Sequence, residues 1–184
     1  MNFPTFLTLL RILMIPLVVI GYYIPVNWSH YIAAIIFLLA CVTDWLDGYL
    51  ARRFGLTTPL GAFLDPIADK LLVAVVLVIV VGQNLIFGLA IPAAVIVGRE
   101  IVISGLREWM AEMGKRASVA VTFVAKIKTT LQMIALILLL CYAPGGSKWL
   151  LWLGTLGLWI AAIMTFWSMS VYLKLAWPDF KQSR

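Results

Sequence analysis

The chain has 184 residues, of which 64% are hydrophobic and 12% are charged, and its formal net charge is +6. A mean hydropathy of +1.04 excludes an ordinary soluble domain and predicts an integral membrane protein. About six spans of roughly 20 residues account for the whole length, so we expect one membrane domain over residues 1–184. The basic residues lie scattered at predicted helix ends, which favours membrane topology and anionic substrates over nucleic acid.

The first predicted span is the apolar run 12–24, and it follows a polar start that contains Thr8 and Arg11. These two residues are three apart, so they share one face of a helix. Arg11 is equally well explained as an anchor on the cytoplasmic side of the membrane. No basic region and no small-residue cleavage site flanks the apolar run, so we expect the span to be retained rather than cleaved as a signal peptide.

Aspartates interrupt the second and third predicted spans, residues 30–54 and 60–81, at four positions: Asp44, Asp47, Asp65 and Asp69. A carboxylate at the bilayer centre costs about 2.5–3.5 kcal/mol on insertion scales, so these residues are functional candidates. The first two are three residues apart and the last two are four apart, so each pair lies on one helix face. Charges that pair or snorkel at the end of a span are the ordinary alternative.

The two acidic pairs are also predicted to lie at the same depth in the membrane. With a turn near residues 55–59, Asp44 and Asp69 each stand about ten residues from it, which is roughly 15 Å along adjacent antiparallel helices. We therefore expect all four carboxylates to converge in one cavity. Oxygen ligands without histidine or cysteine favour magnesium or manganese, and two such ions sharing four carboxylates suit a displacement at phosphorus.

The remaining predicted spans cover residues 85–113, 119–142 and 148–174, and the polar tail from residue 177 onward is expected to fray. Three basic residues are predicted near the cytoplasmic ends of the fourth and fifth spans: Arg107, Arg116 and Lys126. They indicate an anionic acceptor, although anchoring at the membrane surface would also explain them. Lys126 shares a face with threonines, whereas Lys128 lies about 200° away beside Gln132, so we favour Lys126 for a substrate role.

The distribution of charge predicts the topology. With the N-terminus inside, one side of the membrane receives Arg11, the pair at 52–53, the basic loop at 115–116 and the tail from Lys174, and the other side receives only Lys148 and His30. We therefore expect six transmembrane helices, with both termini and the polar active-site cavity facing the cytoplasm.

A longer motif surrounds the aspartates. It reads Asp44-x-x-Asp47-Gly48-x-x-Ala51-Arg52, then, after an eight-residue gap, Gly61-x-x-x-Asp65-x-x-x-Asp69. This series resembles the signature of the CDP-alcohol phosphotransferases. The resemblance implies that the four aspartates hold two divalent ions on the pyrophosphate of a CDP-linked lipid and that Asp69 is the general base. It also implies residues that bind the CDP-lipid: Gly48, Ala51, Arg52, Gly61, Thr8 and Arg11.

Two further stretches, residues 96–116 and 126–133, are similar to those of the bacterial phosphatidylglycerophosphate synthases within this family. This similarity implies CDP-diacylglycerol and sn-glycerol 3-phosphate as substrates, the bacterial cytoplasmic membrane as the location, and a homodimer. A sibling enzyme that accepts serine, inositol phosphate or phosphatidylglycerol is the nearest alternative. A divalent-cation transporter would also use intramembrane carboxylates, but it should show repeated halves and a path to the outer side.

Overall fold

The computed structural model describes residues 3–54, 58–83, 86–113 and 123–182. These residues form helices and no strand, which confirms the all-α expectation. The helices are α1 (Phe3–Tyr23), α2 (Ser29–Phe54), α3 (Pro59–Gly82), α4 (Ala90–Glu112), α5 (Phe123–Cys141) and α6 (Lys148–Gln182).

Three of the described helices contain stretches that are long and apolar enough to cross a membrane: Phe6–Tyr23 in α1, Ser29–Leu50 in α2 and Lys148–Lys174 in α6. A shorter apolar stretch, Ile127–Cys141, lies in α5. Charged residues interrupt α3 and α4, as the sequence predicts. The chain is therefore a helical membrane protein.

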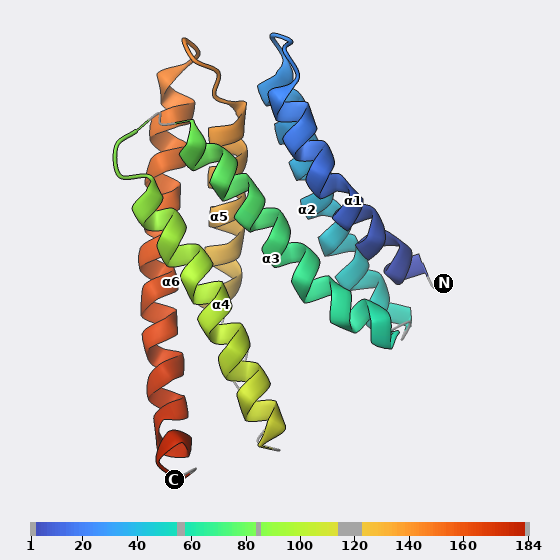
Figure 1. The fold of residues 1–184 in the computed structure, drawn as a ribbon, viewed down its shortest axis with the longest axis vertical. Coiled ribbons are helices and arrows are strands. Elements are labelled where there is room, and N and C mark those ends of the chain that lie inside the picture. Colours follow the sequence, from blue (N-terminus) through green and yellow to red (C-terminus); the bar gives the residue numbers. More distant parts are fainter. Residues whose placement is uncertain (1–2, 55–57, 84–85, 114–122, 183–184) are drawn as a thin grey trace.

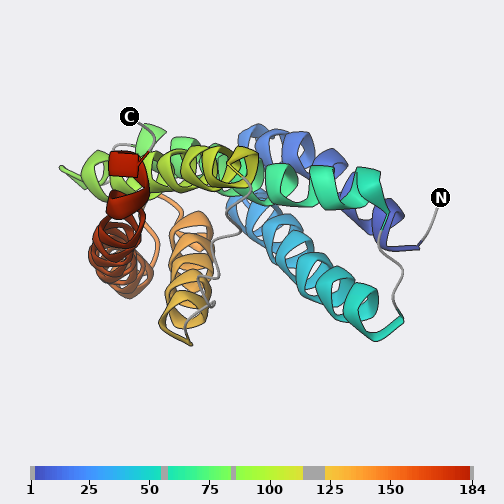
Figure 2. The same ribbon diagram turned by 90° about the horizontal axis from the view of Figure 1, so that it is seen from below.

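The helices run alternately up and down (Figure 1). The links α1–α2, α3–α4 and α5–α6 all lie at the upper end of the view, whereas α2 ends and α3 begins at the lower end. The start of α1 and the end of α6 also point towards the lower end. Seen from that end, α3 and α4 follow one another along one side of the molecule, with α2, α5 and α6 on the other (Figure 2).

Local sequence explains where helices begin. Thr58 caps α3 by accepting a hydrogen bond from the backbone N–H of Gly61 at 3.0 Å, and Pro59 occupies the first turn, where no amide hydrogen is needed. The predicted fourth span begins too early, because Gly88 adopts a φ of +88° and α4 starts only at Ala90. A positive φ ends regular helix, and glycine adopts it at little cost.

The prediction that the tail frays is wrong. α6 continues to Gln182, and its 35 residues span roughly 52 Å, well beyond a hydrocarbon core of about 30 Å. α4 lies against α6, and the guanidinium of Arg107 stands 6.0 Å from the ring centroid of Tyr172, five residues before the tail. Once a helix has formed, each further residue adds one backbone hydrogen bond at low cost, so a long helix extends readily into a polar tail.

The apolar core lies in the half of the bundle away from the acidic residues. Its fully buried members come from all six helices and include Val18, Phe37, Val76, Ile96, Leu136, Leu139 and Leu158. Small residues bring α5 and α6 close together: a Cβ added at Gly154 would stand 2.7 Å from the Leu139 side chain, and one at Gly157 would stand 3.1 Å from that of Ala135. This close approach is typical of helices that pack within a membrane. The core therefore holds the helices firmly and leaves their polar ends to form the site.

Candidate metal and substrate site

The carboxylates predicted to converge come from α2 and α3. Each of Asp44, Asp65 and Asp69 places a carboxylate oxygen within 4.8 Å of the others. Asp47 lies one turn along α2 and contacts the same arginine as the other three. The structure therefore brings the carboxylates of the two helices together around Arg11, as their spacing predicts.

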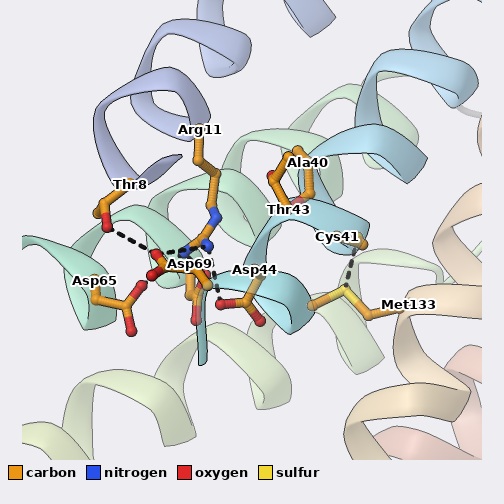
Figure 3. Close-up of polar contacts among 10 residues, drawn as sticks. Thr8, Arg11, Ala40, Cys41, Thr43, Asp44, Asp65, Asp69 and Met133 are labelled. Atoms are coloured by element: carbon orange, nitrogen blue, oxygen red, sulfur yellow. Dashed lines mark hydrogen bonds and ion pairs between the residues drawn. The ribbon is translucent and has the colours of Figure 1, made fainter. Parts of the chain in front are cut away.

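Arg11 of α1 lies at the centre of this cluster (Figure 3). Its Nη1 donates hydrogen bonds to Oδ1 of Asp65 and to Oδ1 of Asp69, both at 2.8 Å. Its Nη2 lies 3.1 Å from Oδ1 of Asp44 and 3.6 Å from Oδ2 of Asp47. The side chain is completely buried, so one guanidinium cross-links three helices through four carboxylates.

Thr8 stands one turn before Arg11 on the same face of α1, as the sequence predicts. Its hydroxyl donates to Oδ2 of Asp47 at 2.9 Å, and both residues are buried. This contact closes one side of the cluster. The side chains of Asp44, Asp65 and Asp69 keep 39%, 43% and 38% exposure, against 7% for Asp47. Three carboxylates are therefore accessible to a ligand. The fourth, Asp47, is nearly buried and contacts Arg11 and Thr8.

The donor set fits a hard divalent cation. Magnesium takes oxygen ligands at about 2.0–2.1 Å, so ligands on opposite sides of one ion stand about 4.2 Å apart, and oxygens within 4.8 Å of one another need only a small adjustment. Four carboxylates against one guanidinium leave a formal charge of −3, which disfavours full ionisation without further cations. The geometry and the charge both point to divalent metal.

The predicted nucleotide-binding positions flank the cluster. Gly48 and Ala51 lie on α2 after Asp47, and Arg52 lies in the last turn of that helix. Gly61 lies in the first turn of α3, where its amide completes the Thr58 cap. The side chains of Ala51 and Arg52 lie outside the described part of the structure, so their roles stay predictions.

The predicted acceptor residues are not assembled within the described residues. Arg107 lies on an exposed part of α4, over the ring of Tyr172. Lys126 belongs to α5, but its side chain is not among those described, and Arg116 falls outside the described residues altogether. This part of the site stays a prediction.

A second polar network links α3, α4 and α5, and sequence reasoning missed it as a unit. The amine of Lys70 donates to the hydroxyl of Ser104, which donates to the backbone carbonyl of Glu100 at 2.5 Å. The Glu100 carboxylate lies 2.7 Å from Nη1 of Arg99 and 4.0 Å from Nζ of Lys128. Lys70 follows directly after Asp69, so this network begins beside the carboxylate cluster.

Lys128 is the buried lysine of this region, with 2% side-chain exposure. Gln132, four residues later, is buried as well. Two polar residues four apart on one helix face were the available signal, but the sequence could not show that this face of α5 turns towards α4.

The chain is similar to known proteins over nearly its whole length. The sequence model described as CDP-alcohol phosphatidyltransferase matches residues 1–167. A protein of Shigella flexneri serotype 5b (strain 8401) is 51% identical over 178 residues, which cover 97% of this chain and 96% of that protein. A protein of Escherichia coli (strain K12) shows the same identity and coverage. Both carry the name CDP-diacylglycerol–glycerol-3-phosphate 3-phosphatidyltransferase.

Proposed function

The chain belongs to the CDP-alcohol phosphatidyltransferase family, and we propose that it transfers a phosphatidyl group from CDP-diacylglycerol to sn-glycerol 3-phosphate. The products are phosphatidylglycerol phosphate and CMP, so the reaction is a step of phospholipid biosynthesis. The observation that carries this proposal is the convergence of three accessible carboxylates from two helices around a buried arginine. It occurs in a chain that is 51% identical, over 97% of its length, to relatives named for this reaction.

We propose that all six helices cross the membrane, with both termini and the carboxylate cluster on the cytoplasmic side of the bacterial inner membrane. The alternating direction of the helices supports this proposal, and three of the described helices have the length and hydropathy of spans. A lipid substrate then reaches the site sideways from the bilayer while the water-soluble acceptor arrives from the cytoplasm. The resemblance also implies a homodimer, which cross-linking in native membranes would test.

Asp44, Asp47, Asp65 and Asp69 would hold two divalent ions, magnesium or manganese. When bound, these ions would polarise the phosphoryl oxygens and offset the charge that develops on the leaving CMP. The three exposed carboxylates have room for external ligands, and Asp47 is held in place by Thr8.

Asp69 would act as general base. It would accept the proton of the acceptor hydroxyl as that oxygen forms a bond to the lipid-side phosphorus, while the bond from this phosphorus to CMP breaks. Asp69 keeps 38% exposure and follows Asp65 by one helical turn, so it can face a substrate as well as a metal. The residues that would bind and orient the CDP-lipid are Gly48, Ala51, Arg52, Gly61, Thr8 and Arg11.

The acceptor phosphate would be bound by Arg107, Arg116 and Lys126. Arginine pairs bidentately with phosphate, which explains why a charged acceptor would be preferred over a neutral one. The exposed position of Arg107 on α4 leaves its guanidinium accessible for this role.

An acceptor panel tests the function. The purified protein is incubated with CDP-diacylglycerol and one acceptor at a time: glycerol 3-phosphate, glycerol, serine, inositol phosphate or phosphatidylglycerol. CMP release should be fastest, in kcat/KM, with glycerol 3-phosphate. Asp65→Asn should abolish it, whereas Glu112→Gln, which neutralises an exposed carboxylate at the end of α4, should leave it unchanged. A faster reaction with another acceptor would make this a sibling enzyme, and no CMP release with any acceptor would refute the transferase.

A further inference from the structure

Arg11 is a buried cation held entirely by residues that belong to the proposed metal site. It has no solvent exposure, and its ion pairs in the described structure go to Asp44, Asp47, Asp65 and Asp69. A buried charge is stable only when it is paired, so the guanidinium and the carboxylates stabilise one another. Arg11 thus already performs, in part, the charge compensation that divalent ions would provide.

The arginine and a metal ion need the same oxygens. Nη1 takes Oδ1 of Asp65 and Oδ1 of Asp69 at 2.8 Å each, and Nη2 approaches Oδ1 of Asp44. These are the three carboxylates whose oxygens lie within 4.8 Å of one another. A divalent ion placed among them would stand in direct contact with the guanidinium, and two cations at such a distance repel each other strongly.

The guanidinium also has unused donors. Its Nε and Nη2 atoms are buried and make no hydrogen bond within the described residues. An arginine presents five N–H groups in a planar fork that matches a phosphate. At 3.1 Å and 3.6 Å the Nη2 contacts are ion pairs of imperfect geometry, so part of the donor capacity is free for another acceptor.

We propose that Arg11 is an internal counter-ion that competes with the divalent cation and is released by the nucleotide. Without nucleotide, the guanidinium holds the four carboxylates together and keeps metal affinity low. When a pyrophosphate and metal bind together, the guanidinium leaves the metal-binding oxygens and pairs with a phosphate. This inference rests on the proposed function, because it takes the carboxylate cluster as the metal site.

The consequence is a coupling between two ligands. If metal and nucleotide both favour the state in which Arg11 has left the carboxylates, each must increase the affinity for the other by the same factor. The anchoring of α1 allows the side chain to move without the helix, because Leu7, Ile15 and Val18 are buried in neighbouring turns. Arg11 is thus a positioning residue that makes the site bind metal mainly when substrate is present.

Manganese binding tests this proposal without any turnover. Mn²⁺ is titrated into the purified protein in nanodiscs and followed by electron paramagnetic resonance, alone and with CDP as a soluble pyrophosphate probe. In the wild type we expect weak binding of Mn²⁺ alone and binding about tenfold or more tighter with CDP. Arg11→Gln should bind Mn²⁺ alone about tenfold more tightly than the wild type and should show a smaller enhancement by CDP, because only the direct contact between metal and pyrophosphate remains.

Two further variants sharpen the test. Arg11→Lys retains the competing charge without the planar fork, so its affinity for Mn²⁺ alone should stay near that of the wild type while the CDP effect falls. Arg53→Gln removes an exposed arginine that bonds to Tyr49 elsewhere on α2, and both of its affinities should match the wild type.

Thermal unfolding provides a second measurement. It compares the increase in Tm that Mn²⁺ causes within each protein, so the variant need not be as stable as the wild type. Removal of Arg11 leaves four uncompensated carboxylates, so Mn²⁺ should raise the Tm of Arg11→Gln by more than it raises that of the wild type. Equal increases in Tm for the two proteins would contradict the proposal that Arg11 is a counter-ion. So would an affinity of Arg11→Gln for Mn²⁺ alone that is equal to or weaker than that of the wild type. If the wild type binds no Mn²⁺ even with CDP, the metal site itself is wrong and the inference falls with it.

Discussion

The ion pairs of Glu100 allow a prediction that depends on the structure and not on the motif. Its carboxylate lies between Arg99 at 2.7 Å and Lys128 at 4.0 Å, and Lys128 is almost fully buried. Glu100→Gln keeps the shape and the acceptor oxygen but removes the charge, so two neighbouring cations lose their counter-ion. Breaking a buried ion pair by removing one partner costs about 3–5 kcal/mol.

We expect the lower end of that range, about 3 kcal/mol, because the Glu100 side chain keeps 28% exposure and water can replace part of the lost interaction. For a chain of this size, 1 kcal/mol shifts the Tm by roughly 2–4 °C, so Glu100→Gln should lower it by roughly 6–12 °C. Thermal unfolding in detergent micelles measures this shift.

A double-mutant cycle separates charge from packing. In the Glu100→Gln background, Lys128→Met removes the unpaired buried cation and should therefore restore part of the lost stability. Residues in direct contact typically show coupling energies of about 0.5–3 kcal/mol. Glu112→Gln, at an exposed position of α4, serves as the control and should shift the Tm by less than about 2 °C. Additive effects of the two substitutions, or a Tm for Glu100→Gln within the range of the control, would refute the buried ion pair.

Three further predictions concern the reaction. EDTA should abolish CMP release and magnesium or manganese should restore it, because the cluster offers only hard oxygen ligands; full turnover with metal shown to be absent would contradict the two-ion site. Asp69→Asn should still bind CDP-lipid but lose kcat, and a rise in KM with kcat unchanged would exclude the general-base role. Each charge-assisted hydrogen bond to phosphate contributes about 1.5–3 kcal/mol, so Arg107→Ala should lower kcat/KM for glycerol 3-phosphate by roughly 10–150-fold. Inorganic phosphate should then compete with this acceptor much less than in the wild type, and unchanged kinetics would place the phosphate pocket elsewhere.

Much of the fold followed from local rules. Hydropathy and charge predicted an all-helical membrane protein, and most helix bounds differ from the prediction by a few residues. The errors have local causes: Gly88 ends regular helix near the predicted start of the fourth span, and α6, once formed, propagates beyond Lys174 to Gln182. A hydropathy pattern shows neither a backbone dihedral nor how far a helix propagates past its apolar stretch.

The candidate site, too, was predictable from the sequence only in part. Spacing within one helix predicts that each aspartate pair shares a face, and the equal distance of the two pairs from the turn predicts that they lie at the same depth. That spacing does not determine how far a helix is rotated against its neighbours. The polar neighbours of Lys126 on its own helix therefore favour it over Lys128, although the structure buries Lys128 near Glu100 of α4.

Composition and helical periodicity are properties of single segments, so they predict the class of the protein and the chemistry of its acids. How those segments meet depends on tertiary packing. It placed Arg11 of the first helix among four carboxylates of the next two, up to 58 residues away along the chain. The reason is physical: a lone charge in an apolar span is costly to bury, and only contact between helices can show which opposite charge offsets that cost.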